Sequence, residues 1–215
     1  MIIKLFVMSL FVCSFLSCFS QEKADRVRIG TQVWMSRNLN VDHYRNGDSI
    51  PEIRDPAVWS NLTTGAWCYY NNDPENGKKY GKLYNWYAVN DSRGLAPEGW
   101  HIPSDAEWTV LENYLGGTHE ACAKLKSTGT TGKGDGLWNM PSPDANNESG
   151  FSGIPGGYRD LNGDYTDLGD DVCWWSSTQR DSTDAWSRNL YYDFTNFIRY
   201  SNYMINGFSV RCLRN

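Results

Sequence analysis

Positive charge is scarce in this chain: its 215 residues include 20 Lys+Arg against 25 Asp+Glu, and the formal net charge is -5. Nucleic-acid binding depends on cations that displace the counterions of phosphates, so this balance argues against a nucleic-acid partner. Glycine and proline, with 20 and 8 residues, are about as frequent as in ordinary globular proteins, which excludes collagen-like and low-complexity chains. Apolar residues make up 40% of the sequence, so a core can form and a disordered chain is excluded.

Catalytic motifs are also missing. His119-Glu120 is followed by Ala-Cys-Ala, so there is no H-E-x-x-H zinc motif. The segment 150–154 (GFSGI) does not match the G-x-S-x-G nucleophile elbow, and no phosphate-binding loop is present. His101 has no titrating partner fixed near it in the sequence, so we expect a structural histidine rather than a base. The sequence predicts a protein that is not an enzyme and needs no cofactor, apart from the calcium considered below.

The first twenty residues have the pattern of an export signal. Lys4 precedes an uncharged, mostly apolar segment from Leu5 to Ser17, which is typical of a signal peptide. This segment is shorter than the roughly 20 apolar residues of a membrane-spanning helix. Phe15-Leu-Ser-Cys18 resembles a bacterial lipobox, in which Cys18 is lipidated and anchors an outer-membrane or cell-surface lipoprotein. The alternative is cleavage before Gln21, which releases a secreted protein; in both cases we expect export, with no membrane contact beyond the lipid.

Close cysteine pairs of the C-x-x-C type are absent, which argues against zinc and dithiol redox motifs. Two of the six cysteines lie in the predicted signal. In an oxidising compartment the other four could form one or two disulfides, or remain buried thiols, and the sequence leaves the pairing open. These four residues are Cys68, Cys122, Cys173 and Cys212.

Aromatic residues are abundant, with 10 Trp, 13 Tyr and 8 Phe, and they recur in segments with strand character. No linker or internal repeat divides the rest of the chain, so residues 27–215 are predicted to form one domain. Alternation around Gly-Thr predicts a hairpin over 27–35, and 66–70 is another short strand candidate. Further strands are predicted over the following segments: 172–178, 185–192, 196–202 and 207–213.

The clearest helix is predicted to begin at Ser104. Ser104 and Glu107 have the spacing of a capping box, and Trp108, Leu111 and Leu115 follow as an apolar stripe. Shorter helices are predicted over 83–89 and 120–126, with a loop over 128–136. The fold class is therefore α+β, with short helices in the first half and a twisted antiparallel sheet with long loops in the second.

Several motifs of the chain are familiar, and they occur in a collinear order. They are IGTQVWMSRNLNV (29–41), NNDPENGKKYGKLYNWYAV (71–89), PEGWHIPSDAEWTVLENYLGG (97–117), NESGFSGIPGGYRDLNG (147–163), CWWSST (173–178) and GFSVRCLRN (207–215). Together they resemble the Fibrobacter succinogenes major paralogous domain family, over nearly the whole chain after residue 26.

The resemblance implies an exported bacterial protein or lipoprotein with a C-type lectin-like fold. The same broad fold class includes the formylglycine-generating enzymes, but the resemblance implies no general activity. Relatives often carry a cysteine just before the P-x-G-W-H segment, where this chain has Ala96. A bridge from that point to Cys212 is therefore ruled out, and Cys212 pairs with Cys68, Cys122 or Cys173, or stays free.

Aromatic residues of the late strands are the candidate ligand-binding site. Trp174 and Trp175 are adjacent on a strand, so their side chains point to opposite faces. One can lie in the core, and we expect the other to face a second layer, a loop or solvent. An exposed ring flanked by polar groups can stack on a sugar, or anchor a protein partner, although most such rings fill cores. The candidate residues are Trp174, Trp175, Trp186, Arg188 and Tyr191, with Tyr192 and Tyr200 nearby.

A calcium site is the candidate for a metal. Asp160, Asn162 and Asp164 alternate on a turn, and hard oxygen ligands in this spacing can converge on calcium. The pattern departs from an EF-hand, because Gly163 comes too early and Asp171 stands where Glu is needed. The alternative is an ordinary Asn-Gly hairpin turn.

These observations predict an exported, non-catalytic binding or adhesion module displayed at a bacterial surface. A glycan is the first expected ligand and a surface protein the second. The competing hypotheses are an enzyme related to the formylglycine-generating enzymes, which would need an activated thiol in an open site, and a purely structural surface protein.

Overall fold

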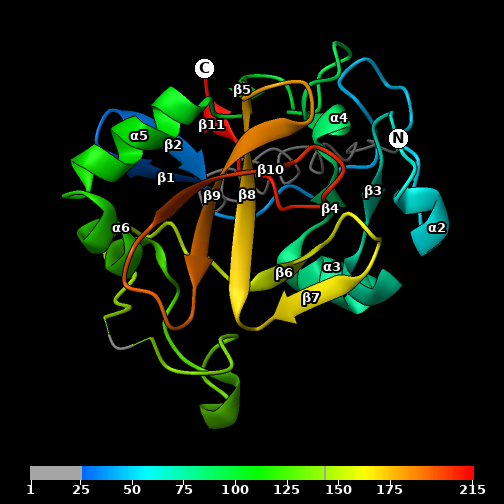
Figure 1. Ribbon diagram of the computed structural model, residues 1–215. Helices are drawn as coiled ribbons and strands as arrows, with labels where there is room; N and C mark the ends of the chain where they lie inside the picture. Colours follow the sequence, from blue (N-terminus) through cyan, green and yellow to red (C-terminus); the bar gives the residue numbers. More distant parts are fainter. Residues whose placement is uncertain (1–25, 143) are drawn as a thin grey trace, which may run out of the picture.

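The computed structural model describes residues 26–142 and 144–215, in a mixed α+β fold with short helices and curled sheets (Figure 1). The predicted signal and the predicted lipidation of Cys18 lie outside these residues. Within the described part of the chain, no helix is long and apolar enough to cross a membrane.

The helices are short, and most begin at a capping side chain. They are α2 (Pro56–Trp59), α3 (Pro74–Tyr80), α4 (Trp86–Val89), α5 (Asp105–Tyr114) and α6 (Thr118–Leu125). Two 3-10 turns cover Tyr70–Asn72 and Thr131–Lys133, the second within the predicted loop 128–136. Helices α2 and α3 were not predicted, although each begins with the strong signal of a capping aspartate followed by proline.

One sheet brings the two ends of the domain together. Its order is β1 (Arg26–Ile29), β2 (Gln32–Met35), β11 (Leu213–Arg214) and β5 (Trp100–His101). The hairpin predicted over 27–35 is confirmed by β1 and β2. Leu213 pairs with both Trp34 and His101, so the last strand lies between the first hairpin and the segment before α5.

The second half of the chain forms a five-stranded sheet of order β10-β9-β8-β6-β7. Its strands are β6 (Gly156–Arg159), β7 (Tyr165–Leu168), β8 (Asp171–Gln179), β9 (Asp184–Tyr191) and β10 (Ile198–Tyr203). Neighbouring strands are antiparallel except β6 and β8, which are parallel. The predicted strands at 172–178, 185–192 and 196–202 are thus confirmed.

The strand predicted over 207–213 is largely wrong. Only Leu213 of this segment lies in a strand. Gly207, Phe208 and Ser209 instead make isolated bridges to β6, to β4 (Leu83–Tyr84) and to β8, respectively. The segment therefore threads between three strands rather than extending one sheet, which alternation of apolar residues cannot reveal.

Two other predictions were close but not complete. The strand expected over 66–70 shrinks to β3 (Trp67–Cys68), and it pairs with β4 (Leu83–Tyr84). The helix expected over 83–89 therefore forms only in its second half, as α4. Asn85 separates the two elements, because its side chain accepts from the backbone N–H of Ala88 at 3.1 Å and caps the helix.

Helix α5 begins as predicted. The Ser104 hydroxyl accepts from the backbone N–H of Glu107, and the Glu107 carboxylate accepts from the backbone N–H of Ser104 at 2.8 Å. The apolar stripe of Trp108, Leu111 and Leu115 is buried. It packs with α6 against one face of the five-stranded sheet, on the left of Figure 1.

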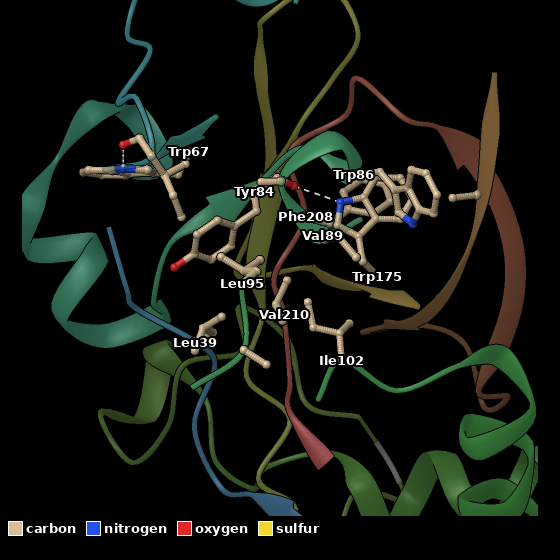
Figure 2. Close-up of a cluster of buried hydrophobic side chains, with 14 of the residues drawn as sticks. Leu39, Trp67, Tyr84, Trp86, Val89, Leu95, Ile102, Trp175, Phe208 and Val210 are labelled. Atoms are coloured by element: carbon tan, nitrogen blue, oxygen red, sulfur yellow. Dashed lines mark hydrogen bonds between the residues drawn. The ribbon is translucent and has the colours of Figure 1, made fainter. Parts of the chain in front are cut away.

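The upper part of the opposite face is covered as well. Trp175 stacks on Phe208 with ring centroids 4.4 Å apart, and Trp86 of α4 packs in the same cluster (Figure 2). The indole N–H of Trp175 donates to the backbone carbonyl of Tyr84 at 2.8 Å, the dashed contact in Figure 2. Nearer to β6 and β7, the same face carries partly exposed polar residues such as Tyr158 and Tyr191.

All four cysteines outside the predicted signal are free and buried in the structure. The alternative of buried thiols therefore holds here for Cys68, Cys122, Cys173 and Cys212. They pack as small apolar groups in all three hydrophobic clusters of the described chain.

Candidate functional site

The expectation that Trp174 or Trp175 is exposed is wrong, because both side chains have an exposed fraction of 0%. The two rings do point to opposite faces of β8, but each face is covered at this point. Trp174 packs against Trp108 of α5, and its N–H donates to Asn38 at 2.8 Å. With no ring face in contact with solvent, neither indole can stack on a ligand in this conformation.

Two further candidates, Trp186 and Arg188, lie on the helix-covered face. Arg188 is 1% exposed, and its guanidinium donates to the Asp105 carboxylate at 2.6 Å. Trp186 is half-buried, and the guanidinium of Arg199 lies 3.3 Å from its ring centroid. The ring of Trp186 is therefore already occupied by a cation of the same chain.

The last candidate, Tyr191, lies on the other face among partly exposed polar groups. The strand register places Asp171 opposite Tyr191, and Tyr200 opposite Ser187 on the same face. Tyr158 of β6 joins them, because it packs edge-on against Phe208 beneath Trp175. We call this surface the tyrosine patch; it consists of Tyr158, Asp171, Asn189, Tyr191 and Tyr200. Tyr200 is 58% exposed, and Tyr158 and Tyr191 are half-buried.

A chain of side-chain hydrogen bonds fixes the patch along β9. The Asn202 amide donates to the Ser187 hydroxyl, which donates to the Asn189 carbonyl oxygen, each at 2.9 Å. The Asn189 amide then donates to the Tyr191 hydroxyl at 2.9 Å. Such a network holds the tyrosine ring in one orientation before any ligand arrives.

Phe194 adds a further aromatic group beside the patch. Its ring centroid lies 5.6 Å from that of Tyr191, and 53% of the residue is exposed. The loop that carries it is held by Lys126, whose ammonium donates to the carbonyls of Tyr191 and Phe194 and to the Ser142 hydroxyl. Burial lowers the pKa of Lys126, and the side chain is fully covered.

Asp171 is the carboxylate at the centre of the patch. It is 7% exposed, and no side-chain hydrogen bond from the described residues reaches it. Burial raises the pKa of Asp171 to about 7, and the charges of Asp167, Asp170 and Asp193 raise it further. A carboxylate held this way can accept hydrogen bonds from a ligand without first breaking bonds within the protein.

A local distortion of the backbone between β6 and β7 lies next to Tyr158. Gly157 has φ +60°, and a Cβ there would lie 2.5 Å from the carbonyl oxygen of Thr166, so only glycine fits. Across from it Asp167 has φ 62°, a left-handed conformation that is rare for a residue other than glycine. Burial and the charge of Asp167 both raise the pKa of Tyr158.

The proposed calcium ligands form a hairpin turn between β6 and β7. The Asp160 carboxylate accepts from the backbone N–H groups of Asn162 and Asp164, each at 2.9 Å. These bonds use the oxygen that a cation would need, and they match the Asn-Gly turn alternative. Within the described residues no group of three or more His, Cys, Asp or Glu is arranged to hold a metal. The calcium site stays a prediction.

His101 has the titrating partner that the sequence did not reveal. Its Nε2 lies 2.9 Å from Glu107 Oε1, and its Nδ1 lies 2.7 Å from Asn215 Oδ1. A groove of about 430 Å³, lined in part by Gln32, Glu107 and Asn215, lies beside this pair. Both ring nitrogens are already engaged, so neither is available to move a proton on a bound molecule.

The thiols do not have the features of a nucleophile. Burial raises the pKa of Cys68 to about 11 and that of Cys212 to about 12, and it raises those of Cys122 and Cys173 as well. A reactive cysteine needs the opposite shift, because the thiolate is the attacking species.

The sequence missed most of the patch. Of its five members the sequence indicated Tyr191 as a candidate with Tyr200 nearby, and it indicated Asp171 only in the calcium pattern. The available signal was the alternation along β8 and β9, which places Asp171 with Cys173, and Asn189 with Tyr191. This signal identifies a common face only once the register between the strands is known.

Comparison with known proteins gives one match. The family model of the Fibrobacter succinogenes major domain matches residues 27–214. No curated protein and no solved structure matches the chain. The matched range runs from β1 to β11 and includes the whole tyrosine patch. The chain belongs to the Fibrobacter succinogenes major domain family.

Proposed function

We propose that this chain is an exported, non-catalytic binding domain of C-type lectin-like architecture, which holds a glycan on the tyrosine patch. The observation that carries the proposal is that the partly exposed Tyr158 and Tyr191 lie beside Asp171, a carboxylate without a hydrogen-bond partner in the described chain, with the exposed Tyr200 farther along the same sheet face. A sugar ring presents an apolar C–H face to an aromatic ring and hydroxyl donors to a carboxylate, so both kinds of group are used.

The setting of the patch favours binding over chemistry. Burial raises the pKa values of Tyr158 and Tyr191, and it also raises that of the neighbouring Cys173 thiol. His101, which lies beside Glu107, belongs to another sheet and has both nitrogens engaged. An enzyme related to the formylglycine-generating enzymes remains the alternative hypothesis. Catalytic turnover of a substrate by the protein, unaffected by the Tyr200→Ala substitution, would favour it.

The C-type lectin-like architecture is supported by the family resemblance and by the sheet that contains both the first hairpin and the last strand. Export, by a lipid on Cys18 or by release, is proposed from the sequence pattern of residues 1–20. Calcium bound at Asp160, Asn162 and Asp164 would order the hairpin beside the patch, and loss of binding with a chelator would support that role.

The experiment uses two tyrosines of β10. Tyr200 and Tyr203 are exposed to similar extents, 58% and 52%, but their register places them on opposite faces of the strand. We expect Tyr200→Ala to weaken retention on an immobilised glycan by about tenfold or more, and Tyr203→Ala to leave it unchanged. Affinity electrophoresis against a panel of neutral, amino and acidic polysaccharides measures this.

Three results would count against the proposal. Retention on none of the polysaccharides would remove the glycan, and a purified surface protein retained through Tyr200 would replace it as the ligand. Equal losses in the two tyrosine variants would show that the patch is not the site. Tyr203 is the matched control, because it shares the strand, the residue type and the exposure of Tyr200.

A further inference from the structure

Negative charge gathers around the tyrosine patch from several elements. Asp171 lies at the start of β8, with Asp167 in β7 and Asp170 in the turn between these strands. Asp193 follows β9, on the loop that also carries Phe194. The charges of Asp167, Asp170 and Asp193 all raise the pKa of Asp171, so all three lie close enough to act on it.

The cation nearest to this group is not available to a ligand. Lys126 is fully buried, and its ammonium is bound by Tyr191, Phe194 and Ser142. Its charge lowers the pKa of Asp171, but this effect is smaller than that of the three carboxylates. An acidic sugar would therefore meet repulsion at the patch, with no exposed cation from Lys126 to compensate.

Asp171 is the acceptor in this group that needs a partner. More than nine-tenths of the residue is buried, and no described side chain donates to it, whereas Asp170 accepts from the Asn139 amide at 3.3 Å. Asp171 lies opposite Tyr191 on the face that Tyr158 and Tyr200 share. A cationic group at this point would gain a carboxylate partner and aromatic neighbours together.

We propose that the tyrosine patch recognises an ammonium group, and that its ligand is an amino-bearing glycan rather than a neutral or acidic one. This inference rests on the proposed glycan-binding function and specifies the sugar. Asp171 forms the charged hydrogen bond to the ammonium. Tyr158 and Tyr191 supply ring faces beside the ammonium, and Tyr200, which lies farther along the same face opposite Ser187, covers the apolar part of a longer sugar chain.

The test compares three oligosaccharides in calorimetry near about pH 6.5, where glucosamine amines are partly protonated and where an ammonium bound beside Asp171 lowers the pKa of this carboxyl and favours its ionised form. The probes are a glucosamine hexamer, the N-acetylglucosamine hexamer with the same backbone, and a galacturonic acid hexamer. We expect the glucosamine hexamer to bind about tenfold more tightly than its acetylated analogue, and the acidic hexamer to bind more weakly than both. Added salt should shrink the difference.

Asp171→Asn is the decisive variant, since it preserves the shape of the side chain and removes its charge. It should reduce the preference for the glucosamine hexamer by about tenfold while neutral binding persists. Asp193→Asn, in an exposed position, should give a smaller loss of the same sign. Asp181→Asn, an exposed aspartate in the turn between β8 and β9, is the control and should give none.

The outcomes separate the two proposals. Equal binding of the glucosamine and N-acetylglucosamine hexamers overturns the ammonium inference and leaves glycan binding standing. A preference for the glucosamine hexamer that persists in Asp171→Asn also overturns it, because the negative charge that attracts the ammonium would then belong to another residue. Binding of none of the three hexamers, together with no retention on the polysaccharide panel, removes both proposals.

Discussion

The two faces of the five-stranded sheet treat their carboxylates in opposite ways. On the helix-covered face, Asp105 accepts hydrogen bonds from Arg188 and Arg199 at 2.6 to 3.0 Å. Burial alone would raise the pKa of Asp105, but the two guanidinium groups overcome this effect and hold the pKa below its usual value. On the other face, Asp171 has carboxylates for neighbours, and its pKa is raised to about 7.

The difference separates a face that serves the fold from a face that we propose binds a ligand. Charged contacts hold α5 against β9, because the guanidinium of Arg188 donates to Asp105 and Thr109. A buried carboxylate without a partner lowers the stability of the fold, because no hydrogen bond or opposite charge within the domain offsets its desolvation. A cost of this kind at a partly exposed cluster is characteristic of functional sites. The comparison therefore favours the tyrosine patch over Trp186 as the proposed binding site.

The largest expected effect concerns the tryptophans, which belong to the core on both faces. Trp174→Ala and Trp175→Ala should each lower the free energy of unfolding by about 3 to 5 kcal/mol, because each leaves a large cavity and an unpaired hydrogen-bond acceptor. Tyr200→Ala and Tyr203→Ala should stay within about 0.5 kcal/mol of the parent chain. Urea denaturation followed by circular dichroism measures all four.

Failure of a tryptophan variant to fold agrees with this expectation. A loss below about 1 kcal/mol for Trp175→Ala alone would contradict it, since the ring would then behave as a surface group. Trp175 would in that case be a ligand-binding candidate again, and the exposed part of its sheet face would extend beyond the tyrosine patch to include it.

The second prediction compares the two aspartates directly. Below its unfolded pKa of about 4, Asp171 is protonated in both states and does not affect stability. As the pH rises through about 7, the folded state must ionise a carboxylate that it disfavours, so stability is lost. Asp171→Asn should therefore raise the free energy of unfolding by about 2 kcal/mol at about pH 8, and leave it unchanged at about pH 4.

Asp105→Asn should have the opposite sign. It removes the charged partner of a buried guanidinium and should lower the free energy of unfolding by about 3 kcal/mol near neutral pH. Urea titrations of both variants across the pH range give the comparison. If both variants lose stability at about pH 8, Asp171 has an internal partner and the proposed role of the patch fails.

Local patterns predicted much of the fold. The capping box at Ser104, the hairpin over 27–35 and the alternation within β8 to β10 each depend on residues close in sequence, and each is confirmed. The segment 207–213 was mistaken for a strand because its partners come from β4, β6 and β8, which lie far apart in the chain. Local periodicity contains no information about such partners.

The candidate site was harder to predict for the same reason. Alternation correctly put Trp174 and Trp175 on opposite faces, but exposure depends on what covers each face, here α5 on one side and Phe208 on the other. Arg188 looked like a ligand group because an arginine on a strand is usually exposed. Its partner Asp105 precedes it by 83 residues, beyond the reach of any local pattern.

The smallest expected effect concerns Glu107, a carboxylate outside the five-stranded sheet. It tests whether a carboxylate with hydrogen-bond donors stabilises the fold there as well. Burial would raise the pKa of Glu107, but hydrogen bonds from Ser104 and His101 lower it below its usual value. Its stabilising effect is therefore present above about pH 4 and is lost as the pH falls through the folded pKa. Glu107→Gln should cost about 1 kcal/mol near neutral pH and progressively less at acid pH, as the parent side chain becomes protonated in the folded state.

The exposed Glu98, two residues before Trp100, is the control. Glu98→Gln should change the free energy of unfolding by less than about 0.5 kcal/mol at either pH. If Glu107→Gln instead raised stability near neutral pH, as expected for Asp171→Asn, then partnering would not separate the two kinds of carboxylate. The raised pKa of Asp171 would then reflect burial alone, and it would lose its value as a marker of the site. A loss for Glu107→Gln together with a gain for Asp171→Asn would tie the sign of each effect to hydrogen-bond partners, which Glu107 has and Asp171 lacks within the described chain.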